Sequence, residues 1–106
     1  MVKKTVLSKI KRFTKALAKD YKISAVYLFG SHARNEAGKY SDIDICIVSP
    51  DFKNKDLDLI SKLRTQACWI DPRLDPYFTT ADQLKNNLVS PLLHEIRKDK
   101  VRVAWR

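Results

Sequence analysis

Two aspartates at alternate positions, Asp42 and Asp44, follow a Gly-Ser pair at Gly30 and Ser31 in the stretch LFGSHARNEAGKYSDIDICIV. Carboxylates at positions i and i+2 of a strand point to the same face, about 6.6 Å apart along it. Two ionised carboxylates there repel each other unless a cation lies between them. Because hard oxygen ligands suit Mg²⁺, the pair predicts a divalent-metal site.

The Gly-Ser pair has a second use. Gly30 lacks a Cβ, so the backbone can turn sharply at the end of a strand and a ligand can approach it closely. Ser31 places a hydroxyl at the start of a helical turn, where free backbone N–H groups favour phosphate. The pair therefore predicts a phosphate-binding turn.

A structural interpretation competes with this one, in which Ser41-Asp42 is only a turn and Asp44 an exposed strand residue. A bare Asp-x-Asp would favour that alternative. The preceding Gly-Ser, lying between two apolar strands, favours the functional interpretation.

The elements that must position these residues follow from the apolar pattern. Helical spacing predicts helices over 3–20 and 56–69, and the apolar run ISAVYLFG predicts a buried strand over 23–30. In DIDICIVS (42–49) three isoleucines alternate with the acids, so we expect the isoleucine face to be buried and the acid face to border a cleft.

The second half of the chain predicts shorter elements around the same sheet. We expect a strand over 73–80, in which Pro76 takes a position without a ladder partner. A Thr80–Gln83 capping box predicts a helix to about Leu88, and Ser90 is the expected N-cap of the helix that Pro91 opens. Alternation predicts a last strand over 101–105. The whole predicts one α/β (α+β) domain over 1–106, with a small mixed sheet flanked by helices.

Gly-Ser, ten residues and Asp-x-Asp resemble the signature of the DNA polymerase β-type nucleotidyltransferases, in particular the minimal nucleotidyltransferase (MNT) domain. Ala33-Arg34 after the Gly-Ser and Ser41 before the acids also resemble that family. The order of elements is similar over nearly the whole chain, and the motif covers about a fifth of it. The resemblance implies the polymerase β-type fold and a nucleotidyltransferase activity.

Members of that family carry a third acid on a later strand, beside the first two. Asp75 is the preferred candidate, because a strand position can point into the cleft made by the other acids. Asp71 is the alternative, but its place before Pro72 is adequately explained by a capping or turn role.

The resemblance implies two-metal transfer of AMP from ATP, with Asp42, Asp44 and Asp75 as catalytic residues and ligands of two Mg²⁺ ions. Gly30 and Ser31 would then bind the β- and γ-phosphates. Arg34 is either a further phosphate contact or a surface residue, and Asp75 either a general base or a ligand alone.

The implied acceptor is a partner protein. Minimal members are often paired with a helical HEPN toxin, and the resemblance implies an antitoxin that transfers AMP to a tyrosine of that partner. We expect a homodimer or a separate partner to complete the acceptor side, because the chain has no room for a further domain.

Charge leaves two alternatives open. The net charge is +9, with +7 in residues 1–22 and +4 in residues 97–106, so positive charge gathers at the ends. One alternative is a partner-binding module with weak or no chemistry that uses these ends. The other is transfer to a small molecule or an RNA end, although no RNA-binding signature accompanies the charge.

The remaining residues indicate a cytoplasmic protein with no membrane span. Cys46 and Cys68 are interpreted as reduced core residues. His32 and His94 are assigned structural roles, and Trp69 and Trp105 are expected in the core or an interface.

Overall fold

Four strands form one sheet in the order β3-β2-β1-β4 in the computed structural model, which describes residues 3–86 and 91–105. The strands are β1 (Ala25–Phe29), β2 (Ile43–Val48), β3 (Leu74–Thr79) and β4 (Val101–Arg102). Strand β1 pairs antiparallel with β2 and β4, whereas β2 and β3 are parallel. The predicted small mixed sheet is therefore confirmed.

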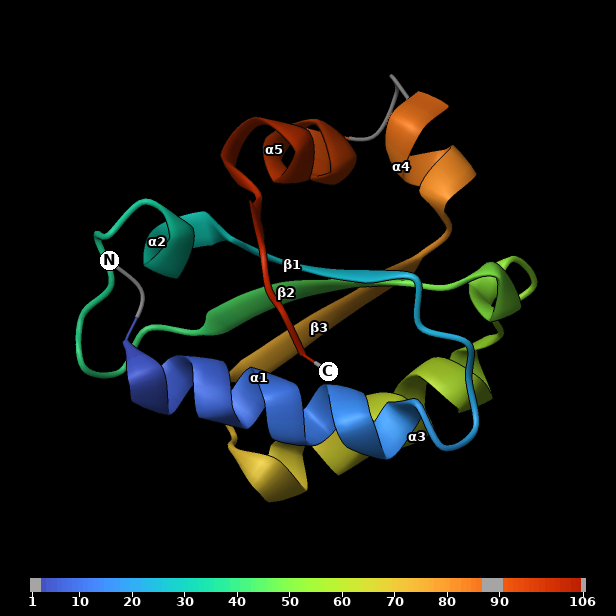
Figure 1. Cartoon of the computed structure of the whole chain (residues 1–106), viewed down its shortest axis with the longest axis horizontal. Helices are drawn as coiled ribbons and strands as arrows, with labels where there is room; N and C mark the ends of the chain where they lie inside the picture. The colour runs from blue at the N-terminus through green and yellow to red at the C-terminus, as the bar shows by residue number, and fades with distance from the viewer. Residues whose placement is uncertain (1–2, 87–90, 106) are drawn as a thin grey trace.

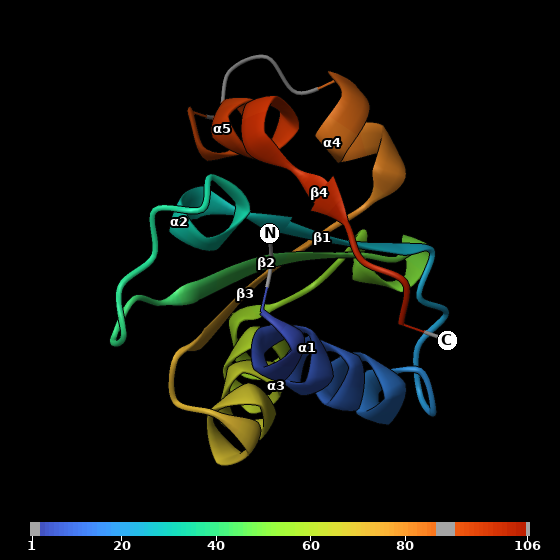
Figure 2. The same ribbon diagram turned by 60° about the vertical axis from the view of Figure 1, so that its left-hand side comes forward.

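Helices cover both faces of the sheet (Figures 1 and 2). Helices α1 (Lys4–Leu17) and α3 (Leu57–Ile70) lie on one face. The other face carries α2 (Gly30–Ala33), α4 (Ala81–Asn86) and α5 (Pro91–Asp99). A 3₁₀ turn, η1 (Pro50–Phe52), follows β2. Every helix and strand that the sequence predicts is present in the expected order, with α2 at the predicted helical turn after Gly30.

Strand β2 has apolar residues buried on both sides. Its three isoleucines are fully buried in the larger cluster, together with side chains of α1 and α3 such as Phe13 and Leu63. Cys46 and Val48 belong to a second cluster under α4 and α5. Asp44 takes the same side as Cys46, at the end of the strand near α2. The chain thus holds a carboxylate against the rim of its apolar core.

Pro76 stands on an edge strand, as the sequence predicts. Ile43 N donates to Arg73 O at 2.7 Å, and Ser49 N donates to Thr79 O at 3.0 Å. In a parallel ladder, alternate residues face the neighbouring strand, so odd-numbered residues of β3 face β2. The nitrogen of Pro76 consequently faces the open edge, where no hydrogen bond is lost.

The predicted cap of α4 is present, because Gln83 N donates to Thr80 Oγ1 at 3.1 Å. Helix α3 has a cap of its own, since Leu59 N donates to Asp56 Oδ1 at 2.8 Å. The predicted helix end near Leu88 and the N-cap at Ser90 lie outside the described residues.

Helix α3 is less buried than its apolar spacing predicts. Leu63 and Ala67 are buried, but Leu57, at the predicted apolar spacing, and Trp69 are 83% and 85% exposed. Cys68 is exposed as well, so its prediction as a core residue was wrong, whereas Cys46 is buried and both thiols are free. The reason is that α3 packs against α1 and β3 through one narrow stripe.

The last strand is shorter than predicted, because β4 ends at Arg102 instead of continuing to 105. Beyond the residues that pair with β1, Val103 N donates a hydrogen bond to Val26 O at 2.9 Å. In the described part of the chain, none of the helices combines the length and the apolar character that a membrane crossing requires.

Candidate active site

Asp44 and Asp75 lie directly opposite each other on neighbouring strands. They are register partners in the parallel pairing of β2 with β3. Partners in register point to the same face, so both carboxylates lie on the side of the sheet that α2 and α5 cover. Asp42 is exposed just before β2 begins, two residues from Asp44. The arrangement brings three carboxylates to one end of two strands.

The negative charge of these three carboxylates affects the pKa of Asp44. Burial is the largest cause, and together with the charges of Asp75 and then Asp42 it raises the pKa of Asp44 to about 6. The carboxyls of Asp44 and Asp75 are near enough for a hydrogen bond between them, and Glu95 of α5 adds a smaller repulsion. The site therefore holds more negative charge than its own side chains neutralise around Asp44.

Gly30 is held against Asp44. Phe29, the last residue of β1, pairs with Asp44, and Gly30 follows with φ +71°, a left-handed conformation that favours glycine. A Cβ on Gly30 would overlap Asp44 Oδ2 and lie 3.1 Å from its carboxyl carbon. The Gly-Ser turn and the Asp-x-Asp strand thus meet where Gly30 packs against Asp44.

Ser31 lies in the single turn of α2 and is half-buried. The first N–H groups of a helix have no acceptor within the helix, so this turn presents donors beside Asp44. The backbone after it closes back, because Glu36 N donates to Ser31 O at 2.8 Å. The Gly30–Ser31 turn therefore places backbone donors next to the carboxylates.

Arg34 is surrounded by acids. Its guanidinium donates to Glu36 Oε2 at 3.1 Å and to Asp99 Oδ2 at 2.9 Å, and Glu95 Oε1 lies 3.9 Å away. The hydrogen bond to Glu36, followed by the one to Asp99, raises the pKa of Arg34. Arg34 thus joins α2 to α5, next to the site.

Asp75 has a basic partner from α3. Arg64 Nη2 forms an ion pair with Asp75 Oδ1, and Arg64 Nη1 donates to Pro76 O at 2.8 Å. Both side chains remain partly exposed, at 50% for Arg64 and 41% for Asp75. Asp75 therefore has a counter-charge, whereas Asp42 and Asp44 form no ion pair within residues 3–86 and 91–105.

The donor set suits a hard divalent cation. Over residues 3–86 and 91–105, no three or more His, Cys, Asp or Glu side chains are already grouped so as to hold a metal ion. Carboxylate oxygens are the ligands that Mg²⁺ prefers, and a cation would relieve the repulsion that burial and two neighbouring acids impose on Asp44. The ligand chemistry and the charge of these residues therefore suit such an ion, although the three side chains are not grouped around one point.

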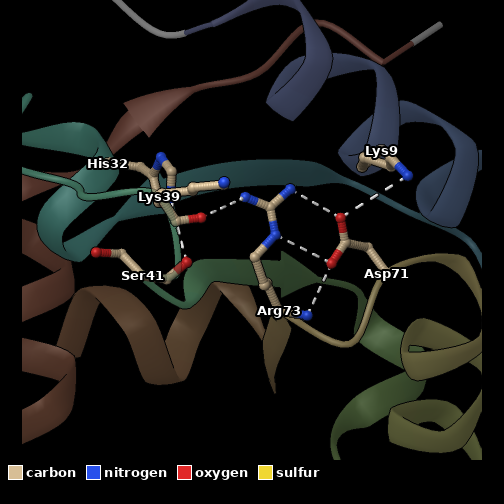
Figure 3. A network of polar contacts seen from close by, with 6 residues as sticks. All are labelled: Lys9, His32, Lys39, Ser41, Asp71 and Arg73. Carbon is tan, nitrogen blue, oxygen red and sulfur yellow. Dashed lines mark hydrogen bonds and ion pairs between the residues drawn. The ribbon is translucent and has the colours of Figure 1, made fainter.

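Asp71 serves the turn between α3 and β3 (Figure 3). Its carboxylate accepts from Arg73 N at 2.8 Å and from Arg73 Nη2 at 2.9 Å, and Lys9 Nζ lies 3.8 Å away. Arg73 also donates to Lys39 O at 3.4 Å, and Arg73 O accepts from Ile43 N. This cluster ties the beginning of β2 to α1 and leaves Asp71 in the turn role that the sequence allowed.

We expect Asp71→Asn to lower the free energy of unfolding at pH 7 by about 2 kcal/mol. Hydrogen bonds from Arg73 lower the pKa of Asp71 to about 2, against 3.8 ordinarily. The stabilisation is thus complete above about pH 4 and disappears as the pH falls through about 2. Urea unfolding at pH 7, 4 and 2.5 should show a shrinking difference from the wild type, while Asp20→Asn, at an exposed carboxylate, changes little. An unchanged difference at pH 2.5 would contradict this account.

The two histidines differ in their burial. His32 is buried in α2 with a ring nitrogen 3.5 Å from Ser41 O, and His94 is exposed on α5. Trp105 packs partly buried against the larger cluster. These positions agree with structural roles for His32 and Trp105.

Two neighbours of the site were not predicted from the sequence. Arg64 reaches over the edge strand from α3, and Glu95 approaches Asp44 from α5. Neither residue belongs to a motif, and each lies in a helix whose spacing shows only its buried face. Only the packing of those helices against the sheet brings them near the acids.

The mixed sheet, the Gly30–Ser31 turn and the carboxylates on two adjacent strands together are typical of a domain that transfers nucleotides. The chain belongs to the nucleotidyltransferase domain family, whose model matches residues 8–103.

Individual relatives agree with the family. A protein of Methanocaldococcus jannaschii named as a candidate protein adenylyltransferase is 48% identical over 42 residues, which are 40% of this chain and 34% of that protein. The match therefore spans about a third of the relative's length.

Solved structures share the fold. A candidate nucleotidyltransferase from Sulfolobus solfataricus superposes with a TM-score of 0.66 at 24% identity, covering 92% of this chain and 78% of the other. A toxin–antitoxin structure with AMP-PNP gives a TM-score of 0.66 at 20% identity, with coverages of 94% and 73%.

Proposed function

We propose that this nucleotidyltransferase transfers AMP from ATP to a hydroxyl group of a partner protein. The observation that carries the proposal is the placement of Asp44 and Asp75 in register, with Gly30 against Asp44. An enzyme that joins a triphosphate to an acceptor needs carboxylates for cations and backbone donors for phosphates at one place, and this end of the sheet offers both.

In the proposed reaction the acceptor oxygen attacks the α-phosphorus of ATP, and the bond to the β-phosphate oxygen breaks to release pyrophosphate. Asp42, Asp44 and Asp75 would hold two Mg²⁺ ions, which supply charge neutralisation and an acidified acceptor hydroxyl when bound. The chain's own contribution is to keep these carboxylates on adjacent strands and to present the Gly30–Ser31 turn to the β- and γ-phosphates.

Arg34 is proposed as a further phosphate contact. Its partners Glu36, Glu95 and Asp99 are carboxylates within 4 Å, so a phosphate would have to compete with them for the guanidinium. Glu36 and Glu95 are well exposed and can be exchanged readily, whereas Asp99, 2.9 Å from the guanidinium, is only 15% exposed and is the main competitor.

The proposed acceptor is a tyrosine of a helical HEPN-type toxin in a cytoplasmic toxin–antitoxin pair, as the family resemblance implies. Two names support a protein partner: a sequence relative named as a candidate protein adenylyltransferase, and a structural neighbour that is a toxin–antitoxin complex with AMP-PNP. The exposure of Asp42 and Asp75 supports it too, because the site faces solvent on the side where an acceptor would approach. A second copy of the chain is the other candidate for closing that side.

Labelled ATP tests the proposal directly. The protein is incubated with Mg²⁺, the protein encoded beside it and ATP labelled either at the α- or at the γ-phosphate. We expect α-label on the partner, no γ-label, and no transfer when EDTA is present. Label from the γ-position would indicate a kinase, and absence of any label would overturn the transfer reaction.

A second candidate function is partner binding without chemistry. A shallow surface hollow is lined by Lys4, Lys11, Arg12 and Lys15 of α1. An adjacent groove places Lys11 beside Arg102, so the two basic ends of the chain meet on one surface. Helix α1 lies on the opposite face of the sheet from α2 and α5, and hence away from the carboxylates (Figure 2).

That separation gives a discriminating prediction. Under the binding-only function, replacing Lys11, Arg12 and Lys15 by glutamate releases the partner in a pull-down and abolishes neutralisation, whereas Asp42→Asn/Asp44→Asn preserves both. Under the transferase function we expect the opposite result for neutralisation. The aspartate double variant loses it and the α1 triple variant keeps it, because the acids are then indispensable. Neutralisation assays with both triple and double variants decide between the two.

A further inference from the structure

We infer that Arg64 is a positioning residue that neutralises Asp75 and competes with a divalent cation for its carboxylate. The inference rests on the proposed function, since it assumes that Asp75 takes part in cation binding. It concerns an arginine outside the Gly-Ser and Asp-x-Asp motifs.

The contacts of Arg64 define this role. One guanidinium nitrogen, Nη2, pairs with Asp75 Oδ1, and the other, Nη1, donates to Pro76 O at 2.8 Å. Because even-numbered residues of β3 face the open edge of the sheet, the Pro76 carbonyl has no strand partner of its own there. The planar guanidinium therefore bridges a backbone anchor and a carboxylate oxygen, a geometry that lysine cannot reproduce.

The same carboxylate oxygen would be a cation ligand. An oxygen that already accepts from a guanidinium binds a cation more weakly, so Arg64 and Mg²⁺ or Mn²⁺ compete for Asp75 Oδ1. The pair is half-exposed, and ion pairs of that kind are readily exchanged. Loss of the arginine also increases the negative charge that attracts the cation.

Mn²⁺ binding to the metal-free protein tests the inference without requiring activity. Titration followed by electron paramagnetic resonance should show that Arg64→Gln binds Mn²⁺ about fivefold more tightly than the wild type, and Arg64→Lys by a smaller factor. Lys62→Gln is the matched control, because it removes one positive charge from an exposed position of the same helix. We expect less than about a twofold change for it.

A double-variant cycle assigns the effect to Asp75. In an Asp75→Asn background, Arg64→Gln should no longer increase the affinity, since the carboxylate for which it competes is absent. Equal or weaker Mn²⁺ binding by Arg64→Gln would overturn the role of Arg64, as would a gain that persists with Asp75→Asn. Wild-type Mn²⁺ binding together with failed AMP transfer would instead refute the proposed function and leave the role of Arg64 standing.

Discussion

Asp44→Asn is expected to reduce AMP transfer by at least about 1,000-fold and at the same time to stabilise the fold. Activity falls because the variant loses the carboxylate that lies between Asp42, Asp75 and the Gly30 turn. Stability rises because burial and neighbouring charges raise the pKa of Asp44 to about 6, so that its ionised form is costly near neutral pH.

The stability change has a definite dependence on pH. A carboxyl whose folded pKa exceeds its unfolded value makes the wild type progressively less stable between about pH 4 and pH 6. Above that window we expect the free energy of unfolding of Asp44→Asn to exceed that of the wild type by about 1–2 kcal/mol. This value is discounted for the solvent-facing part of the carboxylate. The difference should be measured by urea unfolding across pH 4 to 8.

Asp42→Asn serves as the comparison, because Asp42 is exposed and should yield little stabilisation while still losing transfer. Added Mg²⁺ should raise the melting temperature of the wild type more than that of Asp44→Asn. Retained transfer in Asp44→Asn, or a fold less stable than the wild type at pH 7.5, would contradict this view of the site.

Gly30→Ala should be the most damaging substitution of a residue without a functional group. Its φ of +71° costs a residue with a Cβ about 1–2 kcal/mol, and the new methyl group would overlap Asp44 Oδ2. Together these effects are expected to lower the free energy of unfolding by about 2–4 kcal/mol and to displace the Asp44 carboxylate. AMP transfer should fall with that displacement even where the variant remains folded.

Gly38→Ala is the matched control, because a Cβ there would meet only Ser41 Oγ at 3.8 Å. We expect it to change stability by less than about 0.5 kcal/mol. Thermal unfolding and the α-labelled transfer assay should be run on both variants. Equal behaviour of Gly30→Ala and Gly38→Ala would show that the contact between the turn and Asp44 is unimportant.

Much of the site is local in the sequence and was therefore predictable. Gly30 and Ser31 directly follow β1, and Asp42 and Asp44 lie at the beginning of its antiparallel neighbour β2, so a short connection brings the pair of motifs together. Alternation in β2 predicted that the isoleucines would be buried opposite the acids, and they are. The resemblance that these residues carry led to the family that the comparison with known proteins supports.

Cys68 and Trp69 show where local pattern was insufficient. Cys68 was predicted as a core residue and Trp69 as a core or interface residue, yet both are exposed, so neither lies in the core. A hydrophobic residue type indicates that a side chain prefers burial. The width of the buried stripe on a helix, however, depends on how closely another element packs against it.

By itself, the sequence determined the order of elements, the mixed sheet and the Gly-Ser and Asp-x-Asp residues, because each depends on neighbours along the chain. Only the tertiary structure decided that Asp75 faces Asp44 in register, that Gly30 touches Asp44, and that Arg64 pairs with Asp75. Those contacts join different secondary-structure elements, and they are set by strand register and helix packing, which local periodicity does not encode.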